Sequence, residues 1–369
     1  MSIYDDLGIT PIINGYATLT RLGGSLMPPE VLTAMAEAAQ YFVDMDELQV
    51  KVGRKIAEWT HNEAAYVTCG AAAGLALSTA ACITGLDPDK RARLPYTDGL
   101  KNEVILHRSG RVGYDFAVRQ AGGKLIEIGT EQGATVDELE EAITERTAAI
   151  FYFYNVTRMG GQVPLEQGIE IARRHGVPLI VDVAAQIPPV ENLWRFTHLG
   201  ADLALFSGGK GLCGPQSSGL VVGRQALIDA CAFNACPRAF IGRPMKVGKE
   251  ELVGLMAAVR RYLNLDQDQL MQQYEAQVQA VIDAFADRPH VTARRDFPSE
   301  AGQPMPRAEL VFDTQALGLS RDDLLDLLLD GRPRIALAPS GQHGVYVNPQ
   351  TLKPGEEAIV VRRIGEIIG

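Results

Sequence analysis

A glycine-flanked lysine is the residue in this sequence with the clearest chemical potential. Lys210 stands in Ser207-Gly-Gly-Lys-Gly211, directly after the apolar run 201–206. Such a run predicts a strand, so we expect Lys210 at its carboxyl end, where the glycines would let a ligand approach the backbone. A desolvated lysine in such a place can lose its proton and form an imine with a carbonyl compound.

Two nucleotide-binding motifs compete with this interpretation of Lys210. Residues 209–214 satisfy the dinucleotide pattern G-x-G-x-x-G, but that pattern must open a helix, and residues 215–219 lead into another apolar run. A Walker loop needs glycine at Ala204 and serine or threonine at Gly211, so it fails too. We reject both motifs. A surface lysine in a glycine turn remains the alternative when the motif is considered alone.

Asp182, which ends the apolar run 177–182, is the second chemical candidate. A carboxylate buried at a strand end is costly without a cationic partner, and a protonated pyridine nitrogen is such a partner. That contact would keep the pyridine ring an electron sink for a carbanion at the α-carbon of a substrate. A helix-capping or ion-paired aspartate is the alternative.

A turn of small residues, 68–74, is the third candidate. It follows the apolar residues 65–67 and opens an alanine-rich helix, whose first N–H groups could bind a phosphate. Ser207 could add a hydroxyl to the same phosphate. A tightly packed helix without a ligand is the alternative for the turn taken singly. A lysine, an aspartate and a turn that can bind phosphate are together the set with which fold-type I enzymes bind pyridoxal 5′-phosphate (PLP).

The elements that must position these residues alternate between strands and helices. Apolar runs occur at residues 103–107, 124–128, 148–154, 177–182, 201–206 and 219–222. Amphipathic segments such as 135–143 and 165–175 separate them, which predicts an α/β fold with a mostly parallel sheet and helices on both faces. We expect an N-terminal segment (1–50), a large cofactor-binding domain (51–262) and a smaller C-terminal α+β domain (263–369). Ligands of such sheets bind at the carboxyl ends of the strands.

Composition narrows the class of partner. A formal net charge of -10 argues against nucleic acid bound by bulk electrostatics. The five cysteines are scattered without metal spacing, so we expect reduced thiols in a cytoplasm and no metal site. No signal peptide is recognised at the N-terminus. The uncharged stretch 64–86 is rich in small and hydroxyl residues, which favours a buried helix over a membrane span. We expect a small-molecule substrate and no membrane partner.

Several short stretches carry a resemblance to a known family over about the first 260 residues. They are Ile13-Asn-Gly15, Leu22-Gly-Gly-Ser25, Met27-Pro-Pro-Glu30, Val43-Asp-Met-Asp-Glu-Leu48, Cys69-Gly-Ala-Ala-Ala-Gly74, Phe206-Ser-Gly-Gly-Lys-Gly211, Gly214-Pro-Gln-Ser-Ser-Gly219 and residues 241–250, with 352–357 near the C-terminus. On these residues the chain resembles the selenocysteine-synthase-like group of fold-type I PLP enzymes (aspartate aminotransferase-like). That group includes seryl-tRNA selenium transferase and D-glucosaminate-6-phosphate ammonia-lyase.

The resemblance implies a role for individual residues around the cofactor. Lys210 would carry PLP as a Schiff base and move the proton at the α-carbon, and Asp182 would hold the pyridine nitrogen. Phosphate binding would come from Cys69, Gly70, Ala71, Ala72 and Ser207.

Three further residues would surround the cofactor ring. Either His107 or Arg108 would lie over its face, and the choice between them stays open. Asn155 would hydrogen-bond the phenolic oxygen, with a turn cap as the alternative.

Other residues are candidates for substrate or phosphate contacts. In the group's dimers Arg243 would reach a neighbouring subunit's cofactor phosphate, unless its segment is a solvated loop. Arg21 and Lys246, with Arg243, could bind a phosphorylated substrate, and Arg334 could bind the substrate carboxylate, although an ion pair explains it equally. Asp44 and Glu47 could offer an acid or base, or simply form a polar helix end.

The resemblance implies a PLP-dependent lyase as the leading function. It would catalyse α,β-elimination on a small hydroxy-amino acid or amino sugar acid, including a phosphorylated one, and give a 2-oxo acid and ammonia. A racemase, an aldolase, a β-replacement transferase and a catalytically silent homologue are the alternatives. Seryl-tRNA transferases usually carry an extra N-terminal domain, whereas this chain starts near the core motifs and is acidic, so we expect no tRNA substrate. We expect a homodimer or a higher homo-oligomer.

Overall fold

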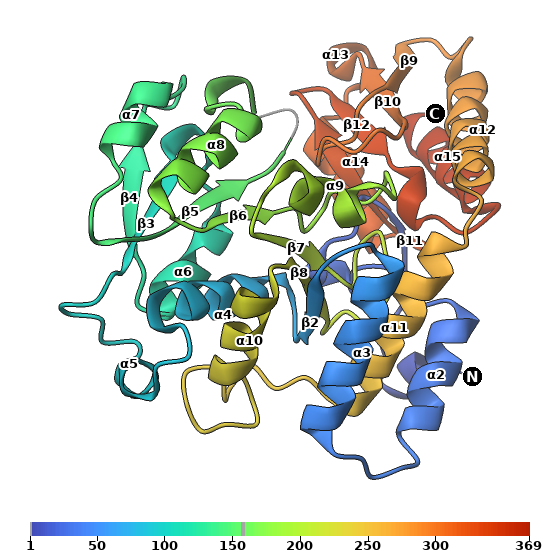
Figure 1. Cartoon of the computed structure of the whole chain (residues 1–369). Helices are drawn as coiled ribbons and strands as arrows, with labels where there is room; N and C mark the ends of the chain where they lie inside the picture. The colour runs from blue at the N-terminus through green and yellow to red at the C-terminus, as the bar shows by residue number, and fades with distance from the viewer. Residues whose placement is uncertain (1, 156–158) are drawn as a thin grey trace. The chain divides into compact units, whose positions relative to one another are not determined.

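The computed structural model describes residues 2–155 and 159–369, and the chain forms two compact units (Figure 1). The large unit comprises residues 27–264, and the small unit comprises residues 1–26 together with 265–369. The expected N-terminal segment 1–50 is therefore divided between the two units. The reason is strand pairing, because β1 (Ile12–Gly15) pairs in parallel with β11 (Arg334–Ser340) of the small unit.

The large unit is built on a seven-stranded sheet with the order β2-β8-β7-β6-β5-β3-β4. Its strands are β2 (Ala64–Thr68), β3 (Glu103–His107), β4 (Lys124–Ile128), β5 (Thr147–Phe153), β6 (Leu179–Asp182), β7 (Leu203–Ser207) and β8 (Gly219–Gly223). The strands from β7 to β4 pair in parallel, whereas β8 runs antiparallel to both β2 and β7. The predicted α/β fold with a mostly parallel sheet is confirmed.

Helices cover both faces of this sheet, with α4, α6 and α10 on one face and α7, α8 and α9 on the other (Figure 1). The helices of the large unit are α2 (Pro29–Ala38), α3 (Met45–Trp59), α4 (Ala71–Thr84), α5 (Pro88–Arg93), α6 (Phe116–Gln120), α7 (Val136–Glu141), α8 (Leu165–His175), α9 (Asn192–Leu199), α10 (Gln225–Asn234) and α11 (Lys249–Leu263). Local sequence sets their ends. Thr135 and Glu138 form a capping box at the start of α7, and α8 ends at Gly176 in the left-handed conformation.

Helix α3 covers the outer edge of strand β2. Gln49 donates from Nε2 to the carbonyl oxygen of Val67 at 2.9 Å, so the helix partly replaces a missing neighbouring strand. A Cβ at Gly53 would overlap the carbonyl of Ala65, and glycine is therefore needed for this close approach. The result is a protected sheet edge next to the end of β2.

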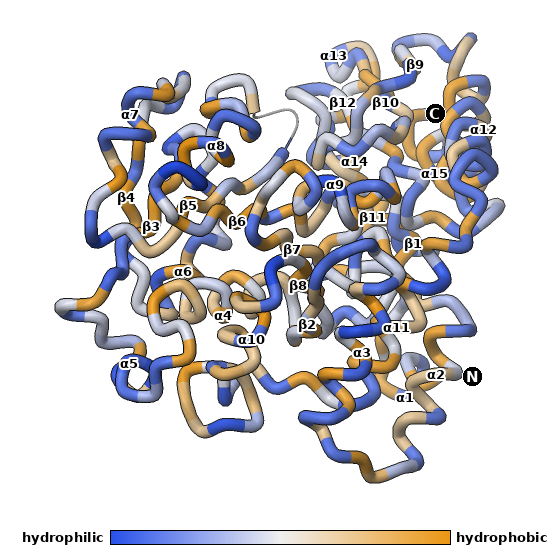
Figure 2. Tube along the Cα trace, viewed as in Figure 1, coloured by the Kyte–Doolittle hydropathy of each residue, from blue (hydrophilic) through white to orange (hydrophobic). Residues whose placement is uncertain are grey.

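The small unit contains a five-stranded sheet with the order β1-β11-β12-β10-β9. Its other elements are α1 (Ile3–Asp6), α12 (Gln267–Phe285), β9 (Val291–Asp296), β10 (Arg307–Phe312), α13 (Thr314–Leu317), α14 (Arg321–Asp330), β12 (Gly344–Val347) and α15 (Glu356–Ile368). This is the expected α+β architecture. In Figure 2 the strands β3 and β5 of the large unit are drawn largely in hydrophobic colours, whereas α12 carries long hydrophilic stretches.

The uncharged stretch 64–86 forms strand β2 and the 14-residue helix α4. None of the helices in the described part of the chain combines the length and the apolar character needed to cross a bilayer.

Candidate active site

Lys210 and Asp182 follow neighbouring strands of the large sheet. Asp182 is the last residue of β6, and it lies opposite Leu205 of β7, the strand that ends three residues before Lys210. Burial raises the pKa of the Asp182 carboxyl, while the N–H of Ala184, which donates to Oδ1 at 2.9 Å, and the charge of Lys210 act in the opposite direction. The side chains thus interact electrostatically at the carboxyl edge of the sheet. Only 9% of Asp182 is exposed, so its ionised form requires cationic stabilisation.

The glycines on either side of Lys210 allow close packing of the turn that carries it. A Cβ at Gly209 would lie 2.6 Å from Cα of Gln216, and a Cβ at Gly211 would overlap the carbonyl of Ile187. Protein atoms fill the space on the Cβ side of these two glycines, and the predicted approach of a ligand to this backbone stays a prediction. The chain then enters β8 and not a helix, which agrees with the rejection of the dinucleotide motif.

Strand β8 brings two distant parts of the expected phosphate site together. Gly219, its first residue, lies opposite both Thr68 at the end of β2 and Ser207 at the end of β7. A Cβ at Gly219 would lie 2.5 Å from the carbonyl carbon of Gly70 and 2.7 Å from the nitrogen of Ala71. We call Gly70, Ala71, Ala72, Ser207 and Gly219 the cradle.

The cradle contains the start of α4, a 14-residue helix. Its N-cap residue, Gly70, has no side chain that could bond to the first N–H groups of the helix. Cys69, which precedes it, is half-buried, and burial raises the pKa of its thiol. The predicted phosphate residues therefore lie at one edge of the sheet. Gly219 is not among the residues predicted from the sequence, although a glycine that opens an apolar strand can signal the close approach of another backbone.

His107 and Arg108 differ sharply in their surroundings. His107 ends β3 and is 2% exposed, its ring meets Tyr152 edge-on at 4.7 Å, and its Nε2 accepts a hydrogen bond from the N–H of Val163 at 3.2 Å. Burial lowers the pKa of His107 to about 4, so the ring is neutral at pH 7. The side chain of Arg108 is 50% exposed and pairs with Glu127 at 3.1 Å. His107 is therefore the better candidate for contact with a buried ring.

Asn155 lies beside the end of β6. Phe153 is opposite Asp182 across the β5–β6 pair, and the N–H of Tyr154 donates to the carbonyl oxygen of Asp182 at 2.9 Å. Asn155 is the next residue, so it stands at the same edge of the sheet as Asp182. Its predicted contact with the cofactor stays a prediction.

Four of the residues proposed for substrate contacts, Asp44, Glu47, Arg21 and Arg334, have local partners. Asp44 caps α3 by accepting from the N–H of Glu47 at 2.9 Å, and Glu47 pairs on the surface with Lys51. In the small unit, Arg21 lies over the ring of Tyr16 at 5.4 Å.

Arg334, also in the small unit, donates from Nε to the carbonyl oxygen of Leu329 at 2.8 Å. These contacts favour capping and packing roles for Asp44 and Glu47, and the predicted substrate roles of Arg21 and Arg334 stay predictions.

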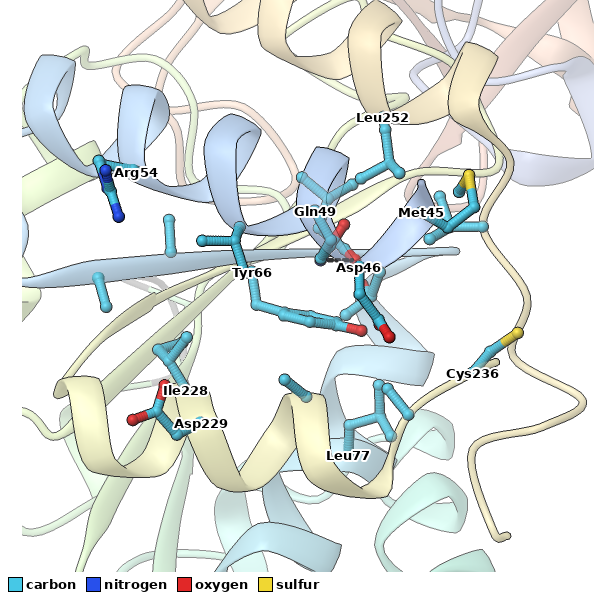
Figure 3. A pocket seen from close by; sticks show the side chains of 18 of the residues that line it. Met45, Asp46, Gln49, Arg54, Tyr66, Leu77, Ile228, Asp229, Cys236 and Leu252 are labelled. Atoms are coloured by element: carbon cyan, nitrogen blue, oxygen red, sulfur yellow. Dashed lines mark hydrogen bonds between the residues drawn. The ribbon is translucent and has the colours of Figure 1, made fainter. Parts of the chain in front are cut away.

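A cavity of about 700 Å³ lies in the large unit (Figure 3). It is lined by α3, β2, α10 and the segment before α11, and Thr68, which precedes Cys69, is part of its wall. Tyr66 extends across it with the hydroxyl toward Asp46 (Figure 3).

Arg243 and Lys246, predicted to bind anions, both line this cavity. Asp46 is paired with Arg238 through two hydrogen bonds of 3.3 Å. Lys210 and Asp182 do not line the cavity, so it is distinct from the lysine–aspartate pair. No group of three or more His, Cys, Asp or Glu in the described residues is arranged to hold a metal ion.

Comparison with known proteins places the chain in a family. The family model described as L-seryl-tRNA selenium transferase matches residues 111–277. D-Glucosaminate-6-phosphate ammonia lyase of Salmonella typhimurium is 35% identical over 99% of this chain and 98% of that protein. This chain belongs to the selenocysteine-synthase-like family.

Solved structures agree with this assignment to the selenocysteine-synthase-like family. A structure of D-glucosaminate-6-phosphate ammonia-lyase superposes with a TM-score of 0.88 at 34% identity and covers 100% of this chain and 98% of that one. Serine palmitoyltransferase, at 14% identity, covers 97% of this chain and 87% of that one with a TM-score of 0.60, which shows a shared fold. The predicted fold-type I architecture is confirmed.

A second member of the family bears a different name. The 5'-C-glycyluridine monooxygenase-decarboxylase of a Streptomyces species is also 35% identical, over 99% of this chain and 92% of that protein. Equal identity to two differently named enzymes means that identity by itself does not choose between their reactions.

Proposed function

We propose that this protein is a PLP-dependent lyase that eliminates water across the α- and β-carbons of an amino sugar acid and yields a 2-oxo acid and ammonia. One observation carries the proposal. The buried Asp182 interacts with Lys210 at the edge of the sheet, in a chain that is 35% identical to D-glucosaminate-6-phosphate ammonia lyase along its length.

The residues present fit the cofactor at three points. Asp182 is a buried carboxylate that a protonated pyridine nitrogen would stabilise. The start of α4 has no side-chain cap, so its N–H groups and Ser207 can receive a phosphate. Lys210 would hold the aldehyde carbon. When bound, PLP supplies an electron sink for the electrons of the broken Cα–H bond.

Each residue would then have a defined task in the reaction. Lys210 Nζ would take the α-proton, and Asp182 would keep the proton on the pyridine nitrogen. The β-hydroxyl would leave with a proton as water, and one water would be taken up again when the released enamine hydrolyses to 2-oxo acid and ammonia. His107, neutral and buried, would cover the ring without adding charge. Arg243 and Lys246 line the separate cavity, so Arg243 would offer its cation to the cofactor phosphate of a neighbouring subunit, and Lys246 to a phosphate of the substrate.

The test combines a product assay with a spectrum. Purified protein is supplied with PLP and incubated with D-glucosaminate 6-phosphate, D-glucosaminate or serine, and ammonia and 2-oxo acid are measured. We expect both products in equal amounts from at least one amino sugar acid, and a visible cofactor band that bleaches with borohydride. Lys210→Ala should lack the cofactor band that bleaches with borohydride, and its rate should be at least about 10³-fold lower than that of the wild type. A protein that stays colourless with PLP would contradict the proposal and favour a catalytically silent homologue.

A monooxygenase-decarboxylase is the second candidate, because a relative of that name is equally identical. It would use O₂ as oxidant and release CO₂ from the substrate carboxylate. An oxygen electrode and a CO₂ assay on 5'-C-glycyluridine distinguish the two: O₂ consumption without ammonia-lyase products would replace the lyase proposal.

A further inference from the structure

Three buried polar atoms at the carboxyl end of β3 lack a hydrogen-bond partner in the described part of the chain. They are Nδ1 of His107 and both Nε2 and Oε1 of Gln162. Gln162 is 6% exposed and His107 2%. Buried polar atoms in folded proteins are nearly always hydrogen-bonded, so three unmatched atoms on two residues indicate a partner beyond the described residues.

The two residues are held next to each other by the backbone. The 3₁₀ turn η2 (Arg108–Gly110) follows His107, and the 3₁₀ turn η4 (Met159–Gly161) precedes Gln162. Ser109 donates from Oγ to the carbonyl oxygen of Gly161 at 3.3 Å, and Val163 donates from N–H to Nε2 of His107 at 3.2 Å. Gln162 lies between these two anchored residues, so its place in the chain is fixed on both sides.

The carboxamide of Gln162 packs against the turn that follows His107. A Cβ at Gly110 would lie 2.7 Å from Nε2 and 3.4 Å from Oε1 of Gln162. Tyr152 donates from its hydroxyl to the carbonyl oxygen of Val163 at 3.2 Å and also meets the ring of His107. The amide is therefore confined beside η2. We call His107, Gln162 and Val163 the His107 cluster.

The hydrogen bond from Val163 determines the tautomer of His107. Nε2 is the acceptor in that bond, so in the neutral ring the proton must be on Nδ1. The lowered pKa of His107, about 4, agrees with a neutral ring. The His107 cluster thus presents two kinds of donor, Nδ1–H of His107 and Nε2–H of Gln162, and one acceptor, Oε1 of Gln162.

We propose that His107 and Gln162 together bind one hydroxyl-type oxygen, either a hydroxyl group of the substrate or a water molecule. Such an oxygen can accept from both N–H groups and donate to Oε1, whereas a carboxylate or phosphate oxygen accepts only and would leave Oε1 unmatched. Through that oxygen Gln162 is a positioning residue for His107. The substrate hydroxyl rests on the proposed function, since amino sugar acids carry several hydroxyl groups, while the tautomer of His107 does not depend on it.

The experiment is ¹⁵N NMR of the PLP-supplied protein labelled at its six histidines. Wild type is compared with Gln162→Met, which keeps the unbranched shape of the side chain, and His107→Gln assigns the signal. We expect Nδ1 of His107 to be protonated in the wild type and its signal to shift in Gln162→Met. If the partner is a substrate hydroxyl, KM for D-glucosaminate should also rise about tenfold with kcat changed less than about threefold, as one lost hydrogen bond predicts. A shift in the signal with unchanged KM identifies water.

A matched control separates this role from a general loss of a buried amide. Gln277 is also buried, but its Nε2 donates to Glu357 at 3.1 Å in the small unit. Gln277→Met should leave the His107 signal at its wild-type position. The proposal is overturned if His107 carries its proton on Nε2, or if Gln162→Met and Gln162→Leu both leave its signal and KM as in the wild type. The NMR comparison needs no turnover, so it stays decisive even if no amino sugar acid is a substrate.

Discussion

The cradle and the His107 cluster lie at the same edge of one sheet, yet they are built in opposite ways. In the cradle, backbone approaches backbone, and Gly219 is required because a Cβ would collide with Gly70 and Ala71. The His107 cluster contains buried polar side chains, and three of their atoms have no partner among the described residues. The backbone of the cradle is thus closely packed, whereas the His107 cluster keeps polar atoms that the described residues do not satisfy.

This difference explains what substitutions should do on each side. A change in the cradle acts through sterics, because an added atom displaces the start of α4. A change in the His107 cluster acts through hydrogen bonding and charge, because the space remains and the polar partner changes. Between them stands the Asp182–Lys210 pair, where charge alone can be altered.

The largest effect is expected for Asp182→Asn. Asparagine keeps the size of the side chain and can still accept from the N–H of Ala184, so only the charge is removed. We expect kcat/KM to fall about 10³-fold, since loss of a preorganised charge at a reacting centre typically costs that much. Steady-state kinetics with far-UV circular dichroism as a folding check measures this. A fall of less than about threefold would show that the charge of Asp182 has no part in the reaction.

The pH dependence of stability tests the buried state of His107. Its pKa is about 4 in the folded protein against 6.5 ordinarily, so the unfolded chain binds more protons between these values. The stabilisation is complete above about pH 6.5 and is lost as the pH falls toward 4. Between pH 7.5 and 5 we expect the wild type to lose about 2 kcal/mol more of its unfolding free energy than His107→Gln does. Urea titrations of both proteins give the values, and parallel losses would mean that His107 titrates normally.

Gly219→Ala tests the steric side of the comparison. The new methyl group would lie 2.5 Å from the carbonyl carbon of Gly70, so the start of α4 must shift. We expect a loss of about 1–3 kcal/mol in unfolding free energy and a PLP affinity lowered about tenfold or more. Gly113→Ala, where a Cβ would meet nothing within 4 Å, is the matched control. Fluorescence titration with PLP measures the affinity, and denaturant unfolding measures the stability. Equal affinity and stability of the two variants would show that the close packing at Gly219 is not needed.

The smallest effect is expected for Arg108→Ala. The exposed pair of Arg108 with Glu127 should contribute less than about 1 kcal/mol to stability, as surface ion pairs generally do. The cofactor band should keep its position in this variant, whereas His107→Gln should move it. Thermal unfolding and visible spectra measure both, and a displaced band in Arg108→Ala with none in His107→Gln would reverse the assignment of the ring contact.

Local features of this protein follow from short stretches of its sequence. Strand periodicity and the residues that end each run predicted the α/β core, and they placed Asp182 at the end of β6 and Lys210 just beyond β7. Helix caps such as those at Thr135 and Gly176 depend on neighbouring residues alone, so a short stretch of sequence specifies them. Strand β9 is largely polar and shows no apolar run, so periodicity does not predict it.

Which distant residues meet depends on how the strands and helices pack. Gly219 lies next to both Ser207 and the start of α4 because β8 runs antiparallel between β2 and β7, and strand order is not encoded in local periodicity. The choice between His107 and Arg108 as the ring contact also depends on packing. His107 is buried against Tyr152 and Val163, while Glu127 holds Arg108 at the surface. Gln162 gave no signal in the sequence, because an unmatched amide becomes visible only when folding has removed water from it.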